Sequence, residues 1–185
     1  MISFDKVTKS YGGVVAVDEL TLEIAEGTLS VFVGPSGCGK TTSMRMINRM
    51  IDPTSGTLTV DGANVATVDP VRLRLGIGYV LQSAGLMPHL KVVDNVATVP
   101  VLKGESRRSA RKKALGVLER VGLDVKLADR YPAQLSGGQQ QRVGVARALA
   151  ADPPILLMDE PFSAVDPQVR EQLQDEFLRL QSELG

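Results

Sequence analysis

The sequence is poor in several residue types and patterns, and each absence excludes a class of protein. It has one cysteine, Cys38, which excludes an internal disulfide and suits a reducing cytosol. No uninterrupted apolar run approaches the ~20 residues that span a bilayer, and the residues after Met1 do not resemble a signal peptide. Basic and acidic residues number 21 each, so bulk charge favours neither nucleic acid nor an anionic membrane as a partner. A membrane role is therefore expected only through a partner protein.

The length and the apolar pattern predict one α/β domain with room for a small subdomain. The chain has 185 residues, 43% of them hydrophobic, and no low-complexity segment. Helices are predicted over 40–50, over much of 84–150, and from 167 onward behind an Asp166 cap. Strands are predicted at 20–24, 29–33, 58–60, 77–81 and 155–158. The last of these has no polar alternation, which is typical of a strand buried on both faces in a parallel sheet.

Residues 34–42 read Gly-Pro-Ser-Gly-Cys-Gly-Lys-Thr-Thr and follow the expected strand 29–33, a pattern typical of a phosphate-binding loop. Glycines let successive backbone N–H groups point at a phosphate, and the helix that follows adds its positive dipole end. Lys40 supplies a positive charge, and Thr41 offers a hydroxyl to Mg²⁺. The alternative is a glycine-rich turn before an ordinary helix. The residues assigned to the nucleoside triphosphate are Gly34, Pro35, Ser36, Gly37, Cys38, Gly39, Lys40, Thr41 and Thr42.

Two acidic residues follow the buried run 155–158 directly. Ligands of open parallel sheets bind beyond the carboxyl ends of the strands, so Asp159 and Glu160 are expected beside the phosphates. Asp159 is assigned to Mg²⁺, and Glu160 to the polarisation of a water for attack on the γ-phosphate. The alternative is an acidic pair in an ordinary loop before Pro161.

Leu135-Ser136-Gly137-Gly138-Gln139 forms a second candidate anion site, where Ser136 and two glycines begin a helix predicted to run to about Ala150. This pentapeptide stands between a phosphate loop and a hydrophobic strand that ends in Asp-Glu. In that order the sequence resembles the ATP-binding-cassette (ABC) ATPases. The resemblance assigns Ser136, Gly137, Gly138 and Gln139 to the ATP of a second cassette, because in this family two cassettes pack head to tail around each nucleotide.

The resemblance extends from one end of the chain to the other and implies further roles. Tyr11 matches the aromatic residue that stacks on adenine, although a tyrosine at a strand end is the alternative. Gln82 matches the glutamine that contacts Mg²⁺ and the attacking water and links to the transmembrane partner. The segment 163–166 matches the loop that crosses to the other subunit. ATP and Mg²⁺ are thus the expected cofactors.

The fold that the resemblance implies is a P-loop NTPase of the ABC type. It has a parallel-sheet core, an antiparallel β subdomain at the N-terminus and a helical signature subdomain at 84–150. Family members carry a further strand, ending in a histidine that contacts the γ-phosphate, after the helix that matches 167–184. Residues 1–185 are therefore expected to be an incomplete nucleotide-binding domain, either the N-terminal part of a longer cassette or a truncated gene product.

Three segments, 46–56, 76–82 and 85–89, are similar to the ATPases of importers for quaternary amines such as glycine betaine, carnitine and choline. The resemblance implies a second cassette, permease subunits that contact 83–100, an indirect link to a substrate-binding protein, and a place on the cytoplasmic face of the membrane, with no nucleic-acid partner. The alternatives are an importer ATPase for an amino acid, a metal or a polyamine, a non-transport ABC protein of DNA repair or translation, and a non-hydrolysing nucleotide-binding fragment. The basic run at 107–113 is interpreted as a solvated helix face.

Overall fold

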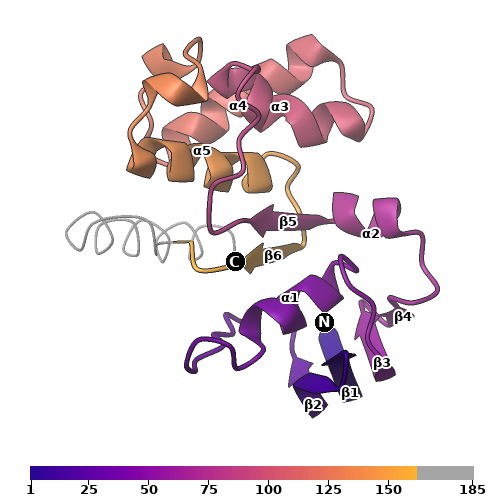
Figure 1. The fold of residues 1–185 in the computed structure, drawn as a ribbon. Coiled ribbons are helices and arrows are strands. Elements are labelled where there is room, and N and C mark those ends of the chain that lie inside the picture. The colour runs from indigo at the N-terminus through magenta and orange to yellow at the C-terminus, as the bar shows by residue number, and fades with distance from the viewer. Residues whose placement is uncertain (162–185) are drawn as a thin grey trace. The chain divides into compact units, whose positions relative to one another are not determined.

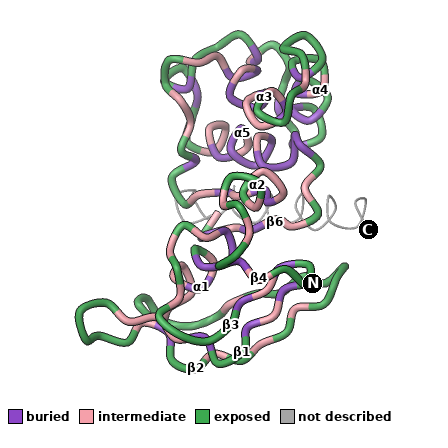
Figure 2. Tube along the Cα trace, turned by 90° about the vertical axis from the view of Figure 1, so that its right-hand side faces the viewer, coloured by how far each residue is buried: buried purple, intermediate pink, exposed green. Residues whose placement is uncertain are grey.

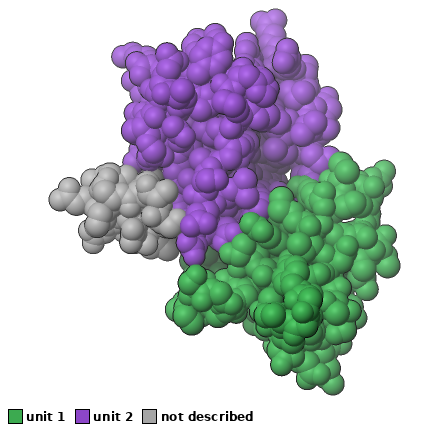
Figure 3. Space-filling model, in the orientation of Figure 1, with its two compact units in different colours: residues 1–74 green, residues 75–185 purple. Residues whose placement is uncertain are grey.

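The computed structural model describes residues 1–161 and divides the chain into two compact units, residues 1–74 and residues 75–185 (Figure 3). The segment 163–166 and the helix predicted from 167 onward lie outside the described residues. Within the described part of the chain, no helix is long and apolar enough to cross a membrane.

An antiparallel sheet, as expected for the N-terminal part, dominates the first unit (Figure 1). Its strands run in the order β2-β1-β3-β4. The elements are β1 (Ile2–Tyr11), β2 (Val14–Ile24), α1 (Lys40–Ile47), β3 (Ser55–Val60), β4 (Ala63–Asn64) and α2 (Pro70–Leu75). Phe4 and Val7 of β1, Leu58 of β3, and Met46 and Ile47 of α1 are almost completely buried, so the sheet and α1 share a small apolar core.

The strand expected before the phosphate loop is absent, and this prediction was wrong. Residues 29–33 have no regular structure, and the side chains of Val31 and Val33 are 72% and 88% exposed. A strand exists only when its backbone groups pair with a neighbour, and no strand within residues 1–161 pairs with this segment. The predicted helix 40–50 is also shorter, because α1 ends at Ile47 and Arg49 has a positive φ of 52°.

Three helices and a two-stranded parallel sheet form the described part of the second unit (Figure 1). The elements are β5 (Ile77–Val80), α3 (Val92–Leu102), α4 (Arg107–Arg120), the 3₁₀ turns η1 (Val125–Leu127) and η2 (Pro132–Gln134), α5 (Gly137–Leu149) and β6 (Ile155–Met158). Ile77 pairs with Ile155 and Val80 with Met158. The parallel pairing confirms the prediction for 155–158. Burial on both faces was wrong, since only Leu157 of β6 is buried and β5 is its only described neighbour.

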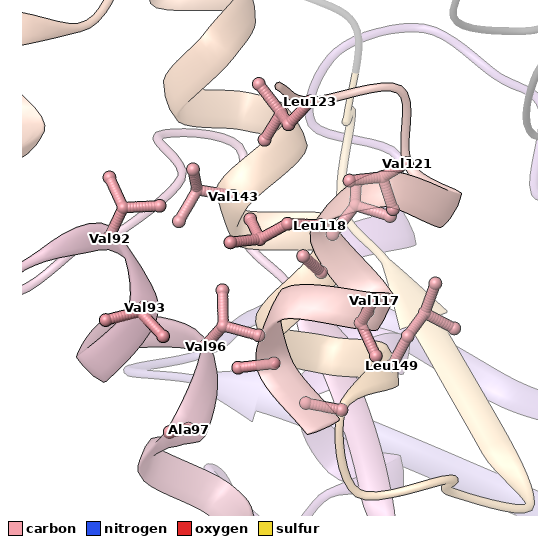
Figure 4. Close-up of a cluster of buried hydrophobic side chains, with 14 of the residues drawn as sticks. Val92, Val93, Val96, Ala97, Val117, Leu118, Val121, Leu123, Val143 and Leu149 are labelled. Carbon is pink, nitrogen blue, oxygen red and sulfur yellow. The ribbon is translucent and has the colours of Figure 1, made fainter. Parts of the chain in front are cut away.

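The helices of this unit enclose a continuous apolar core (Figures 2 and 4). Helix α4 begins at a Ser106 cap and buries Ala110, Ala114, Val117 and Leu118, which recur at spacings of three and four residues on one face, inside the predicted helical stretch 84–150. These side chains meet Val92, Val93 and Val96 of α3 and Val143 and Leu149 of α5. Helix α5 is therefore packed against α3 and α4.

A substitution at Gly56 tests the close approach of β3 to β1 in the first unit. Gly56 has φ +83° where β1 bulges between Asp5 and Thr8, and an added Cβ would lie 2.6 Å from Val7 Cα. Gly62 has φ +75° but open space around it, which makes it a matched control. We expect Gly62→Ala to lose about 1–2 kcal/mol of unfolding free energy for the left-handed backbone, and Gly56→Ala to lose a further ~1–3 kcal/mol for overpacking. Urea unfolding measures both losses; equal losses would contradict the close approach.

Candidate functional site

The phosphate loop lies in the first unit, and its shape depends on two left-handed glycines. Gly37 has φ +84° and Gly39 has φ +93°, values that side chains other than glycine rarely adopt. A Cβ on Gly39 would lie 2.5 Å from the carbonyl oxygen of Ala16, so the loop is also held close to β2. A Cβ on Gly34 would lie 2.6 Å from the sulfur of Cys38. Residues 34–38 are exposed, so the loop is open to a ligand.

Lys40 folds back over this loop. Its ammonium group donates to the carbonyl oxygens of Gly34 at 2.7 Å and Pro35 at 2.9 Å, and lies 3.7 Å from the sulfur of Cys38. Lys40, Thr41 and Thr42 form the first turn of α1. This arrangement places a full positive charge and the positive end of a helix at one exposed loop, which is favourable for an anion.

Tyr11 ends β1 beside the Gly12-Gly13 turn, and its ring is 48% exposed. The ammonium group of Lys9 lies 5.0 Å from the ring centroid, in cation–π contact with it. The exposed aromatic face is suited to stacking on a planar ring.

Gln82 and Glu160 meet in the second unit. The amide nitrogen Nε2 of Gln82 donates to Oε2 of Glu160 at 3.1 Å, although the two residues are 78 positions apart. Both follow the carboxyl ends of the paired parallel strands β5 and β6. Glu160 has a φ of +46°, which costs a non-glycine residue about 1–2 kcal/mol and is typical of functional positions. The structure therefore brings the two residues assigned to the attacking water into direct contact.

Asp159 directly follows β6, next to Glu160, and is only 5% exposed. Its backbone N–H donates to the carbonyl of Val80 at 3.0 Å, which extends the ladder one residue past β6. The hydroxyl of Tyr79 donates to its Oδ2 at 3.4 Å. A buried carboxylate with its orientation fixed in this way is suited to a metal ion.

The signature segment caps α5, as the sequence predicted. Ser136 is the N-cap: its Oγ accepts from Gln139 N at 3.3 Å, and Gln139 Oε1 accepts from Ser136 N at 3.0 Å. The hydroxyl accepts with a lone pair, so its proton can be donated to an anion. Gly137 and Gly138 form the first turn, where the helix dipole is positive.

The predicted metal set consists of oxygen donors: the hydroxyl of Thr41, the amide of Gln82 and the carboxylate of Asp159. Such a set fits Mg²⁺, which prefers oxygen and keeps other positions for water and phosphate. Within residues 1–161, no three histidine, cysteine, aspartate or glutamate side chains gather as a metal cluster.

Sequence reasoning missed three polar side chains that hold the segment between β5 and α3. Asn95 of α3 and Gln141 of α5 are the buried ones, and Arg147 of α5, which is partly buried, acts beside them. Gln141 is 3% exposed on a helix face that is otherwise apolar. A polar residue inside an apolar stripe is the signal that could have found it.

Comparisons with known proteins agree with this geometry. A sequence model of the family described as ABC transporter matches residues 17–163. A carnitine transport ATP-binding protein of Listeria monocytogenes is 51% identical over all of this chain and 47% of its own length. A choline transport ATP-binding protein of Bacillus subtilis is 50% identical over all of this chain and 49% of its own length. The chain thus spans about half the length of these relatives.

A solved structure gives the same result for the fold. The dimeric post-hydrolysis state of an ATP-binding cassette bound to ADP and phosphate has a TM-score of 0.90 to this chain and is 36% identical. The alignment covers 99% of this chain and 84% of that one.

Two serine caps in the second unit make a matched pair for testing the signature geometry. Ser136 caps α5, and Ser106 caps α4 by accepting from Ser109 N at 3.2 Å. We expect Ser136→Ala and Ser106→Ala each to lower the unfolding free energy by about 1 kcal/mol, because each leaves a helix N–H without its side-chain acceptor. Chemical denaturation measures both. A Ser136→Ala chain as stable as the parent would show that the cap contributes nothing.

Proposed function

The chain belongs to the ABC transporter family, and from this premise we propose that it binds ATP with Mg²⁺ and hydrolyses it to drive a membrane importer. The observation that carries the proposal is the Gln82–Glu160 contact at the ends of two parallel strands. A glutamine amide that donates to a carboxylate orients that carboxylate. An oriented carboxylate suits the role of a base that positions the attacking water in γ-phosphate hydrolysis.

The phosphate loop supports the binding half of the proposal. Backbone N–H groups of residues 34–42 hold the phosphates, and Lys40 exchanges its contacts with the carbonyls of Gly34 and Pro35 for the outer phosphates. Tyr11 supports the adenine. Thr41, Gln82 and Asp159 hold Mg²⁺, which when bound neutralises charge on the phosphate oxygens. Glu160 accepts the proton of the attacking water, and Gln82 keeps its carboxylate in position.

A second copy completes each site in this proposal. Ser136, Gly137, Gly138 and Gln139 of one copy donate to the ATP held by the phosphate loop of the other. The N-terminal ends of α1 and α5, which both favour an anion, support this arrangement. The dimeric state named for the solved relative supports it as well. ATP then favours the closed dimer because it contacts both copies, and hydrolysis releases them.

Quaternary amines such as glycine betaine, carnitine and choline are the proposed solutes. The names of the relatives, which include carnitine and choline transport proteins and an osmoprotectant import protein, support this choice. The proposed partners are permease subunits that contact residues 83–100 on the cytoplasmic face of the membrane and, through them, a substrate-binding protein. Residues 1–185 act as nucleotide-binding domain, with 84–150 as its helical subdomain.

Glu160→Gln tests the catalytic assignment. We expect ATP hydrolysis to fall by about 10²–10⁴, the contribution of a general base, while ATP-bound dimers accumulate because binding is unaffected. Phosphate release and size-exclusion chromatography with ATP measure the two effects. Glu119→Gln, on the exposed side of α4, is the matched control and should hydrolyse ATP at the parent rate. Unchanged turnover in Glu160→Gln would remove Glu160 from this role.

Lys40→Ala tests the binding assignment. We expect the dissociation constant for ATP to rise about tenfold or more, since a charge-assisted hydrogen bond contributes ~1.5–3 kcal/mol. Calorimetric titration measures the constant. Arg45→Ala removes a positive charge from the exposed face of the same helix and should bind ATP like the parent. Equal weakening in both variants would mean that general charge, and not the loop, binds the nucleotide.

A further inference from the structure

The segment that carries Gln82 is fastened to α5 by two polar side chains, the buried Gln141 and the partly buried Arg147. Gln141 is 3% exposed, and its Nε2 donates to the carbonyl of Leu81 at 3.3 Å, directly before Gln82. Arg147 donates from Nη2 to the carbonyl of Ala84 and from Nη1 to that of Gly85, both at 2.7 Å, two and three residues beyond Gln82. The backbone on each side of Gln82 is therefore bonded to the same helix.

The planar guanidinium group of Arg147 suits these two carbonyl contacts in a way that another cationic group would not. Burial lowers the pKa of its guanidinium group, although an arginine stays charged at neutral pH. A charged group that is partly removed from water needs hydrogen-bond acceptors. The carbonyls of Ala84 and Gly85 match the two parallel N–H donors of the guanidinium group. A lysine at this position would keep the charge but lose the planar pair of donors.

The backbone at the anchor point is strained. Ala84 is buried and has a φ of +39°, a left-handed conformation that alanine rarely adopts. Such a conformation persists only where the surroundings fix it. Besides Arg147, the close approach of α5 at Gly144 fixes it, because an added Cβ on Gly144 would lie 3.4 Å from the Cα of Ala84.

The far end of the segment is fixed separately. Asn95 of α3 is completely buried; its Oδ1 accepts from Met87 N at 2.8 Å, and its Nδ2 donates to the carbonyls of Met87 and Leu90, each at 3.1 Å. The backbone near Gln82 is therefore held in place by α5, whereas the backbone from Met87 onward is held in place by α3.

We propose that Gln141 and Arg147 are positioning residues that join α5 to Gln82 as one rigid piece. A displacement of the Ser136 end of α5 then moves the Gln82 amide relative to Glu160. This inference rests on the proposed function, in which Ser136 contacts ATP and Gln82 orients Glu160. It gives the signature segment a route to the hydrolytic pair of its own chain, along one helix and through hydrogen bonds to three backbone carbonyls.

The first experiment measures the fastening itself. The chain has no tryptophan, so Ser83→Trp, at an exposed position next to Gln82, provides a single fluorescent reporter. We expect Arg147→Lys to lower the steady-state anisotropy of this reporter. Arg142→Lys is the matched control, since Arg142 lies on the same helix and donates to the carbonyl of Gly122 at 2.8 Å; it should leave the anisotropy unchanged. An unchanged anisotropy in Arg147→Lys would overturn the fastening.

The second experiment measures its consequence for hydrolysis in the native chain without the reporter. We expect Arg147→Lys, and separately Gln141→Leu, to lower kcat about tenfold, the effect of losing one charge-assisted or buried hydrogen bond, with the dissociation constant for ATP within about twofold of the parent. Gln141→Leu preserves side-chain volume, so it tests the idea even if Arg147→Lys folds poorly.

A double-mutant comparison separates positioning from a general loss of structure. If the two side chains act through Gln82, Arg147→Lys should change kcat less than about twofold in a Gln82→Ala background. An equal drop in both backgrounds would overturn the positioning role. A parent chain that hydrolyses no ATP would overturn the proposed function instead, and the anisotropy measurement would still decide the fastening.

Discussion

The parallel pairing of β5 with β6 is the interaction on which the candidate hydrolytic site depends. Because Val80 is in register with Met158, both strands end at the same edge, and the residues that follow them are neighbours. The bond from Asp159 N to the carbonyl of Val80 continues the ladder past the strand. A one-residue slip would turn each side chain of one strand to the opposite face and separate Gln82 from Glu160. The register of four paired residues thus determines which side chains meet at the site.

Two strained residues lie next to this pairing. Ala84 and Glu160 both adopt left-handed conformations, although neither is glycine. Each stands just beyond a strand end and is surrounded by fixed groups: the guanidinium of Arg147 in one case, and the Gln82 amide in the other. Packing of α3, α4 and α5 into one apolar core supplies the rigidity that keeps such conformations populated. The segment that carries Gln82 and Ala84 is therefore held against the signature helix.

The geometry of the phosphate loop, in contrast, depends mainly on residues that are close together in the sequence. Left-handed glycines, the start of α1 and the folded-back Lys40 all lie within a few residues of one another. Such a loop needs little from the rest of the fold beyond the close approach of β2 at Gly39. This locality explains why an exposed, unpaired segment at 29–33 coexists with a formed loop and helix.

By itself the sequence determined the features that depend on neighbouring residues. These include the glycines and lysine of the phosphate loop, the Ser136–Gln139 capping box, and the apolar spacing of α4, since backbone conformation and helix capping act over a few positions. Tertiary structure alone decided that 29–33 forms no strand and that Gln141 and Arg147 fasten α5 to Leu81, Ala84 and Gly85, contacts between residues 60 or more positions apart. Strand pairing and hydrogen bonds between elements require a distant partner, and the residues on either side of a position in the chain do not specify that partner.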